Sequence, residues 1–322
     1  MMLHIKSPYK KSSSLSNCCG LNVYIKLDNV QPSGSFKMRG IGHLCSKFAE
    51  KGASKFVCSS GGNAGLAAAY AARELGKPCQ IFTPESTPKF IVQNLRDYGA
   101  EVIVEGEAWD ESNTRAKKEA EKPGCVYVSP FDHPDIWEGN STIIDEIKED
   151  VDRCSSLPKP DLIICVCGGG GLLCGIVHGL KKHNWNDIPV LVVETEGASS
   201  LYQSVKADKL VTLPAITSIA KTLGAKTVGK RTFEVTKTHK VVSHIVSDAD
   251  AVKAIALFLD DERILVEPSC AAALAAVYNG TLKKLIESGE LPSNIKNVAI
   301  EICGGSGIKL DMLEKWKKEF SV

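Results

Sequence analysis

The sequence of 322 residues predicts an α/β fold in which largely parallel sheets carry helices on both faces. Short apolar runs alternate with helical patterns along the whole chain. Turns rich in glycine and serine follow several of these runs, as expected at the ends of strands. With 43% hydrophobic and 24% charged residues, the composition is that of a globular protein, and the length allows about two domains.

The first half of the chain alternates between strand-like and helix-like segments. β-branched and aromatic residues mark the strands, and the spacing of apolar residues marks the helices. Gly76-Lys77-Pro78 ends an alanine-rich helix that follows a turn of small residues. Strands are expected at residues 23–27, 56–58, 79–82 and 101–104, and helices at 40–51, 66–75 and 90–98.

The second half repeats the same rhythm. Residues 162–167 form a continuous apolar run, which is typical of a strand buried in a parallel sheet. Four glycines follow this run, and a helix is expected from there to Leu180. Residues 153–161, with Pro158 and Pro160, are the most linker-like stretch. Further strands are expected at 190–194 and 298–302, and helices at 248–260 and 269–278.

The charge balance argues against two classes of partner. With 39 basic and 38 acidic residues the net charge is +1, so neither a nucleic acid nor a membrane surface is an expected partner. The longest apolar stretch, residues 162–177, is broken by glycines, and the N-terminus lacks an apolar signal core. We therefore expect a cytoplasmic protein without a transmembrane span.

The 12 cysteines contain no Cys-x-x-Cys pair, so we expect them to be reduced and not to form a zinc site.

Lys37 ends the turn Pro32-Ser33-Gly34-Ser35-Phe36-Lys37. The turn residues fix the backbone, and Phe36 places an apolar ring beside the amine. A lysine desolvated in this way has a lowered pKa and becomes a nucleophile that can form a Schiff base. The alternative is a solvated lysine that begins a helix after an ordinary turn, which is the usual state of a single lysine.

The tetraglycine loop, Gly168 to Gly171, lies between a predicted buried strand and a predicted helix. Bare backbone N–H groups at a helix N-terminus make a phosphate cradle. The loop could instead be a close-packing turn, or part of a dinucleotide site in which Glu194 holds a ribose hydroxyl. The G-x-G-x-x-G spacing fails, however, because Leu173 and Cys174 stand where the third glycine is needed.

Two further turns follow predicted strands. The turn from Ser59 to Gly65 opens a helix and favours an anion such as a carboxylate, although an ordinary helix cap is the favoured explanation of this turn taken alone. Asn63 adds an amide that can donate to a phenolate-type oxygen. Cys303-Gly304-Gly305 places a weak thiol donor at a strand end, where a buried structural cysteine is the alternative.

The four features together match one cofactor. Ligands of parallel α/β folds bind at the carboxyl ends of strands, where these turns are predicted to lie. Pyridoxal 5′-phosphate has an aldehyde for the lysine, a phosphate for the tetraglycine loop, a 3′-oxygen for the amide and a ring nitrogen for the thiol. The joint match is more specific than any single motif.

These motifs resemble the L-serine/L-threonine dehydratases, the animal serine dehydratase group and its serine dehydratase-like paralogue. The resemblance covers nearly the whole chain, including residues 130–134 and 260–268. It implies the β-family fold of pyridoxal phosphate enzymes (fold type II), with two open, twisted, mostly parallel sheets flanked by helices. It also implies a large cofactor-binding domain of residues 1–34 and 136–322, and a small mobile domain of residues 35–135.

The resemblance also implies a role for each site residue. Lys37 is the catalytic residue and the covalent attachment point, Phe36 covers one ring face, Asn63 bonds the 3′-oxygen and Cys303 faces the ring nitrogen. The cofactor phosphate is held by Gly168, Gly169, Gly170, Gly171 and the Leu172 amide. The substrate carboxylate is received by Ser60, Gly61, Asn63 and Ala64. A monovalent cation, K⁺, is bound by Gly168, Glu194, Ala198, Ser200, Leu223 and Ala225.

The activity implied is β-elimination of L-serine to pyruvate and ammonia, and of L-threonine to 2-oxobutanoate and ammonia, by a homodimer. The chain ends without room for a regulatory domain, so we expect amino-acid catabolism, feeding gluconeogenesis, rather than feedback-controlled synthesis.

Two positions depart from the better-known serine enzyme. Gly61 replaces an alanine, as in the paralogue, and Thr222 falls where the family places alanine against the second ring face. A serine racemase, a cysteine synthase-like β-replacement enzyme and a weakly active cofactor-binding paralogue stay open as alternatives.

Overall fold

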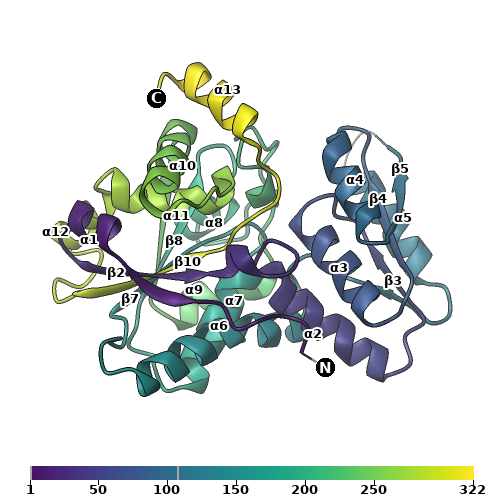
Figure 1. Ribbon diagram of the computed structural model, residues 1–322, viewed down its shortest axis with the longest axis horizontal. Helices are drawn as coiled ribbons and strands as arrows, with labels where there is room; N and C mark the ends of the chain where they lie inside the picture. Colours follow the sequence, from purple (N-terminus) through teal and green to yellow (C-terminus); the bar gives the residue numbers. More distant parts are fainter. Residues whose placement is uncertain (1, 107–108) are drawn as a thin grey trace.

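The computed structural model describes residues 2–106 and 109–322, over which the strands form two sheets. The larger sheet has the strand order β1-β2-β10-β7-β8-β9, and the smaller one has the order β5-β4-β3-β6. All neighbouring strands are parallel except β1 and β2. The smaller sheet and its helices stand apart from the larger sheet in Figure 1, joined to it through helix α2. The predicted pair of mostly parallel sheets is therefore confirmed.

The larger sheet consists of β1 (Tyr9–Ser12), β2 (Asn22–Leu27), β7 (Leu162–Val166), β8 (Val190–Thr195), β9 (Val241–Val246) and β10 (Asn297–Ile302). The smaller sheet consists of β3 (Lys55–Cys58), β4 (Cys79–Thr83), β5 (Glu101–Val104) and β6 (Cys125–Tyr127). Strands β7 and β8 are buried along their whole length, as their apolar sequences predict.

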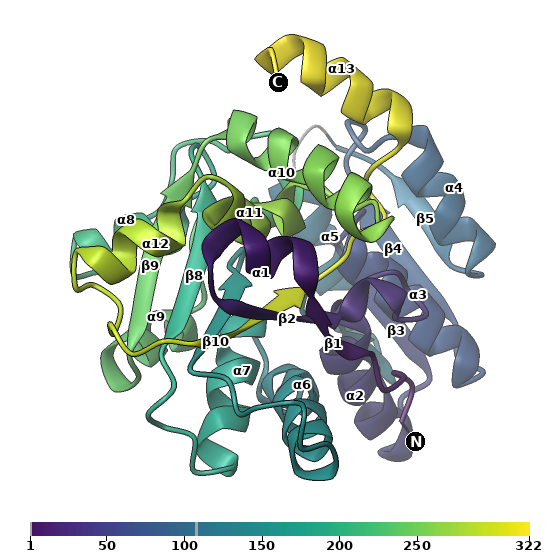
Figure 2. The ribbon, with the colours of Figure 1, turned by 60° about the vertical axis from the view of Figure 1, so that its left-hand side comes forward.

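Helices cover both faces of the larger sheet. Helices α10 and α11 lie on one face, and α6 and α7 lie on the other (Figures 1 and 2). Their apolar faces and the strands between them form the main core. None of the helices described here is both long enough and apolar enough to cross a bilayer. The helices are α1 (Ser13–Cys19), α2 (Lys37–Glu50), α3 (Asn63–Glu74), α4 (Lys89–Asp97), α5 (Trp109–Ala120), α6 (Pro134–Arg153), α7 (Gly171–Lys182), α8 (Ser200–Lys206), α9 (Lys230–Thr238), α10 (Asp248–Glu262), α11 (Pro268–Tyr278), α12 (Thr281–Glu287) and α13 (Leu310–Phe320), with 3-10 turns η1 (Asp28–Val30) and η2 (Lys221–Leu223).

Each predicted strand and helix is present within a few residues. The two helix starts that matter for function lie earlier than predicted, since α2 begins at Lys37 and α3 begins at Asn63. Sequence patterns missed β9, a half-buried strand, and α6, which begins directly after His133 with Pro134 as its first residue. They also missed the short elements β1, β6, α1, α5, α8, α9, α12 and α13. The linker-like stretch of residues 153–161 connects α6 to β7 beside the larger sheet and does not join the two sheets.

A buried charge cluster fastens α2 to the larger sheet. The Arg39 guanidinium is fully buried and donates to both oxygens of Asp28 (2.6 and 2.7 Å) and to both oxygens of Glu146 (2.6 and 2.8 Å). Lys26 donates to Glu146 at 2.6 Å. These bidentate pairs compensate the desolvation of the charges and hold the helix two residues from Lys37.

Glu301 is a third carboxyl group near this cluster, and it has no cation of its own to pair with among the described residues. Two cations, Lys26 and Arg39, are already matched by Asp28 and Glu146, and both side-chain oxygens of the buried Glu301 lack a hydrogen-bond donor among the described residues. Burial raises the pKa of Glu301 well above its usual range, and the Asp28 carboxylate raises it further. The structure therefore holds Glu301 as a neutral acid beside Asp28.

Glu301→Gln is expected to make the protein more stable at neutral pH. Above the pKa of a free carboxyl group, the unfolded chain releases the proton that folded Glu301 retains, so the free energy of unfolding falls by about 1.4 kcal/mol per pH unit from this group. Glutamine has the same shape and does not titrate. Urea unfolding at pH 5 and pH 7 should therefore show a gain for the variant that grows with pH. Parallel pH dependences of the two proteins would exclude a proton on Glu301.

Candidate active site

The turn before Lys37 lies directly against the turn that contains Cys303. The Phe36 N–H donates to the Cys303 carbonyl (3.1 Å), and the Gly305 N–H donates to the Gly34 carbonyl (2.9 Å). A Cβ on Gly304, which has φ +82°, would lie 2.5 Å from that same carbonyl oxygen, so only glycine permits this approach. The contact brings the first residue of α2 to the carboxyl end of β10.

Lys37 points from the start of α2 into the space between the two sheets. Its Nζ donates to the Pro130 carbonyl at 2.5 Å and lies 5.2 Å from the centre of the Phe36 ring. Burial lowers the pKa of Lys37 to about 8. At pH 7 roughly 10% of such amines are unprotonated, against about 0.03% for an ordinary lysine. The predicted desolvated lysine is present, and Pro130, whose carbonyl carries no sequence signal, is a partner that sequence reasoning missed.

The tetraglycine loop turns at the carboxyl end of β7 into α7. A Cβ on Gly169 would meet the Phe131 ring at 2.2 Å, and one on Gly170, which has φ +94°, would meet Thr232 at 2.0 Å. The loop is held from behind, since the Gly169 carbonyl accepts from the Gly229 N–H (3.0 Å) and from Thr232 Oγ1 (2.9 Å). No side chain among the described residues caps α7, so the amides of its first turn are available to an anion. Close packing of the loop is thus present, and the free amides leave the anion cradle a prediction.

Glu194 is the penultimate residue of β8 and is fully buried. Its two oxygens accept from the Leu201 N–H (3.0 Å) and the Tyr202 N–H (2.7 Å) at the start of α8. Burial raises the pKa of Glu194 to about 8. The carboxyl group of Glu194 therefore caps α8 and is not free to bind a ribose hydroxyl. The dinucleotide alternative loses this feature in addition to the failed glycine spacing.

The residues expected to bind a cation form two groups in the structure, one beside Glu194 (Ala198 and Ser200) and one beside Gly168 (Leu223 and Ala225). Ala198 forms an isolated β-bridge with Thr195, the residue that follows Glu194. A Cβ on Gly168 would lie 3.3 Å from the Leu223 Cα. The Ala225 N–H donates to the Leu223 carbonyl at 2.8 Å. The Ser200 hydroxyl is buried without a hydrogen-bond partner among the described residues. An orphaned buried oxygen beside a buried carboxylate suits a hard cation.

Asn63 is the first residue of α3 and is nearly buried. Its Oδ1 accepts from the Ser306 N–H (3.1 Å), and its Nδ2 donates to Glu267 Oε1 (2.8 Å). These bonds fix the orientation of the amide and leave one N–H of Nδ2 for a ligand. The first turn of α3 has no side-chain cap either, so the amides near Ser60 and Ala64 can receive a carboxylate.

Glu267, at the N-terminus of α11, is a site residue that sequence reasoning missed. Besides Asn63, its carboxyl group accepts from Thr222 Oγ1 and from the Gly307 N–H (3.3 Å). Burial raises the pKa of Glu267. The only signal in the sequence is its place in the stretch 260–268. Thr222 turns its hydroxyl to Glu267 and its methyl group to Gly62, so the hydroxyl is occupied within the protein.

Cys303 and Gly61 complete the set. Cys303 is buried, and its contact with the Cys270 thiol and its burial raise the pKa of Cys303 well above the usual value, so the thiol is neutral. A Cβ on Gly61 would meet the Thr87 side chain at 2.9 Å and the Thr83 side chain at 3.1 Å. The departure at Gly61 therefore concerns packing within the smaller sheet's layer rather than contact with Lys37.

The residues present fit pyridoxal phosphate. The amine of Lys37 has a lowered pKa, the amide of Asn63 has a free N–H and the thiol of Cys303 is neutral. Within the described residues, no side chain caps α3 or α7, and the turns that open these two helices both approach Thr222. Such a set can form a covalent bond with an aldehyde, hold a phosphate and a carboxylate on separate helices, and leave a pyridine nitrogen uncharged.

Comparison with known proteins gives matches along nearly the whole chain. Residues 1–304 match the family described as pyridoxal-phosphate dependent enzyme. A Bos taurus protein named L-serine dehydratase/L-threonine deaminase is 50% identical over 322 residues, which cover 99% of this chain and 97% of that protein. A Homo sapiens protein named serine dehydratase-like is 48% identical over 314 residues, which cover 98% of this chain and 94% of that protein.

A solved structure agrees with the sequence matches. The crystal structure of a fungal L-serine ammonia-lyase from Rhizomucor miehei superposes with a TM-score of 0.91 at 38% identity. The superposition covers 99% of this chain and 100% of that one. The likeness therefore includes both sheets and all the turns that surround Lys37.

Proposed function

The chain belongs to the family of pyridoxal-phosphate dependent enzymes, and we propose that it is an L-serine/L-threonine ammonia-lyase. It converts L-serine to pyruvate and ammonia, and L-threonine to 2-oxobutanoate and ammonia. The observation that carries this proposal is the half-buried Lys37, with a pKa of about 8, close to Cys58 and Cys167, which precede the turns into α3 and α7. The names of similar proteins from animals and a fungus support the same reaction.

Lys37 is the residue that moves the proton. Pyridoxal phosphate, when bound, supplies an aldehyde for covalent attachment and a conjugated ring that withdraws electrons from the substrate α-carbon. The neutral Nζ of Lys37 accepts the α-proton, because burial removes the stabilising water from its charged form. The Pro130 carbonyl keeps this nitrogen in place through the 2.5 Å hydrogen bond.

The other residues bind and orient. The amides of the tetraglycine loop and of Leu172 would hold the phosphate, and Phe36 would cover one ring face. Asn63, oriented by Ser306 and Glu267, would donate its free N–H to the 3′-oxygen. The neutral thiol of Cys303 would face the ring nitrogen and leave it uncharged, which would favour elimination over transamination. The substrate carboxylate is received at the start of α3 by Ser60, Gly61, Asn63 and Ala64.

The proposal is tested by assaying pyruvate from L-serine and 2-oxobutanoate from L-threonine with the cofactor-loaded protein. We expect both products with release of ammonia. Formation of D-serine without pyruvate would identify a racemase, and a new amino acid formed in the presence of sulfide would identify a β-replacement enzyme. Cofactor absorbance without any product would identify a cofactor-binding paralogue.

Thr222→Val is expected to lower the stability of the cofactor-free protein by about 1–2 kcal/mol, because valine keeps the shape but removes the donor to buried Glu267. Looser Glu267 also frees Asn63, so the cofactor dissociation constant should rise several-fold. Thr222→Ser, which retains the hydroxyl, is the matched control. Thermal unfolding and a cofactor titration measure both effects, and equal behaviour of the two variants would show that the hydroxyl is idle.

We also propose that K⁺ binds between β8 and the tetraglycine loop, with oxygens from Gly168, Glu194, Ala198, Ser200, Leu223 and Ala225. The orphaned Ser200 hydroxyl and the buried Glu194 support this site. Glu194→Gln is expected to remove the activation by K⁺ over Na⁺, while the wild-type protein shows it. Turnover of the wild-type protein that does not depend on the cation would refute the site.

The proposal also covers the compartment, the oligomeric state, the metabolic role and the domains. The protein acts in the cytoplasm as a homodimer, in amino-acid catabolism that feeds gluconeogenesis. Residues 35–135 form a small mobile domain that closes on the large domain, residues 1–34 and 136–322. All strands of the smaller sheet lie within residues 35–135, which supports this division. Light scattering tests the dimer, and hydrogen exchange with and without cofactor tests the mobile domain.

A further inference from the structure

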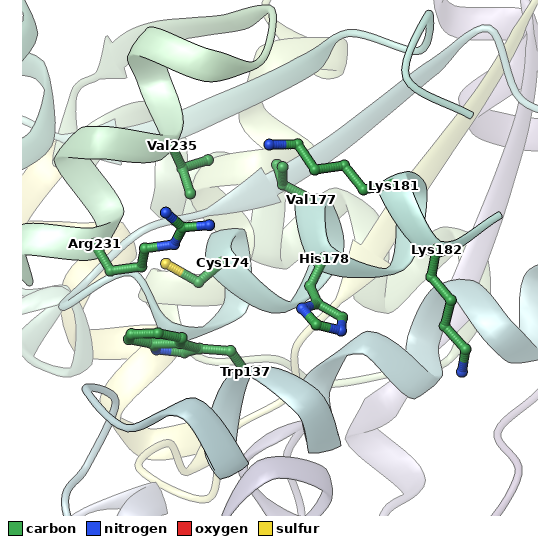
Figure 3. A pocket seen from close by; sticks show the side chains of 8 residues that line it. All are labelled: Trp137, Cys174, Val177, His178, Lys181, Lys182, Arg231 and Val235. Atoms are coloured by element: carbon green, nitrogen blue, oxygen red, sulfur yellow. The ribbon is translucent and has the colours of Figure 1, made fainter. Parts of the chain in front are cut away.

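A pocket of about 520 Å³ lies behind the tetraglycine loop, between α6, α7 and α9 (Figure 3). Its apolar part comes from Trp137, Cys174, Val177 and Val235. Its basic part comes from His178, Lys181, Lys182 and Arg231. The volume is in the range of small-molecule sites, and nothing in the reaction proposed above uses this pocket.

The charge of this rear pocket is one-sided, since none of its eight lining residues is acidic. Lys182 is paired with Asp145 at 2.8 Å and points away from the pocket in Figure 3. Within the part of the chain that the structure describes, the one ion pair of Arg231 is with Glu234, at 3.5 Å. Lys181 lies 3.4 Å from the uncharged Thr238 hydroxyl and extends over the apolar part. Lys181 and Arg231 therefore offer positive charge to an occupant.

One wall of the rear pocket leads to Lys37 and to the tetraglycine loop. Trp137 Nε1 donates to the Phe131 carbonyl at 3.1 Å. The Phe131 ring fills the space in front of Gly169, and the residue before it, Pro130, accepts the hydrogen bond of Lys37. A ligand that shifts Trp137 therefore acts on Lys37 and on Gly169 through residues 130–131.

The opposite wall leads to the same loop. Arg231 precedes Thr232, which fills the space beside Gly170 and donates to the Gly169 carbonyl at 2.9 Å. Cys174, on the pocket floor, lies with its sulfur 3.6 Å from Thr232 Oγ1. Interiors this tightly packed transmit small displacements. The rear pocket and the phosphate cradle therefore share their supporting side chains.

We propose that the rear pocket binds a small organic anion with a flat apolar body, such as an aromatic carboxylate, and that its occupancy changes the affinity of the protein for its cofactor. The carboxylate pairs with Lys181 and Arg231, and the ring packs on Trp137, Val177 and Val235. A second copy of this chain is a poorer occupant, because a symmetric contact would bring these cations against each other. The binding part stands alone, and only the coupling part rests on the proposed function.

The experiment uses 2-naphthoate as the probe and the uncharged 2-naphthamide as its matched control. Calorimetry with the full-length protein should show that naphthoate binds and that naphthamide binds at least about tenfold more weakly. Arg231→Ala and Lys181→Ala should each weaken naphthoate binding by a similar factor. Lys230→Ala, which removes an exposed lysine next to Arg231 but outside the pocket, should leave it unchanged.

Coupling is measured by titrating the cofactor with and without saturating naphthoate. We expect the cofactor dissociation constant to change, and the naphthoate constant to change by the same factor when cofactor is bound, since linkage is reciprocal. No binding of naphthoate, or equal binding of naphthamide, overturns the site. Binding with an unchanged cofactor constant overturns the coupling alone. Dissociation of a dimer by Arg231→Ala, without naphthoate binding to the wild-type protein, would assign the surface to an interface between copies.

Discussion

Lys37→Ala is expected to lose covalently bound cofactor and at least about a thousandfold in turnover of L-serine. The variant lacks both the attachment point and the group that accepts the α-proton. The described partners of this amine are the Pro130 carbonyl and the Phe36 ring, with Cys58, Cys167, Glu267 and Cys303 nearby, and none of them is a lysine. The measurements are the absorption spectrum of the purified protein with added cofactor and the rate of pyruvate formation.

Lys51→Ala is the matched control for this prediction. Lys51 stands at the other end of α2, where its Nζ lies 5.4 Å from the Phe48 ring on the surface. Its removal should change neither the spectrum nor the rate. If Lys37→Ala formed pyruvate at the wild-type rate, the assignment of the proton transfer to this lysine would be wrong.

Arg39→Met is expected to destabilise the protein by about 3–5 kcal/mol. Methionine fills much of the volume but leaves Asp28 and Glu146 buried with far less compensating charge. Because Arg39 lies one turn or less from Lys37, the helix start should also loosen, and the cofactor affinity should fall. Urea unfolding of the cofactor-free protein measures the first effect, and a cofactor titration measures the second.

Lys47→Met is the control on the same helix. Lys47 pairs with Asp135 and Glu138 at 2.7 Å each, with its side chain 35% exposed. Surface pairs of this kind contribute up to about 1 kcal/mol. Arg39→Lys, which keeps the charge and loses the bidentate geometry, should fall between the two. Equal losses for Arg39→Met and Lys47→Met would show that burial of the Arg39 cluster does not matter.

Local signals account for the parts of the fold that the sequence predicts well. The apolar run of β7 and the glycines after it predict a buried strand followed by a loop. A continuous apolar run is typical of a strand that is covered on both faces of a parallel sheet. The start of α2 is three residues earlier than predicted, since the turn chemistry of residues 32–35 conceals the first helical turn. Helix α6 is missed for a similar reason, as His133 and Pro134 look like a turn.

The parts that the sequence does not predict depend on long-range contacts. Arg39 and Glu146 are 107 residues apart, and no local pattern pairs them. Pro130 contributes a backbone carbonyl, which any residue could supply. Glu267 looks like an ordinary acid before a helix until the fold sets it against Asn63 and Thr222. The resemblance to known dehydratases indicated the cofactor, but not these supporting residues.

The most direct test of the whole account is to find where the cofactor is attached. Treatment of the cofactor-loaded protein with borohydride makes the covalent bond permanent, and peptide mapping by mass spectrometry then locates it. We expect one modified peptide, with the cofactor on Lys37. A modified lysine elsewhere, or a fully loaded protein with no modified peptide, would contradict the central claim that this half-buried lysine carries the chemistry.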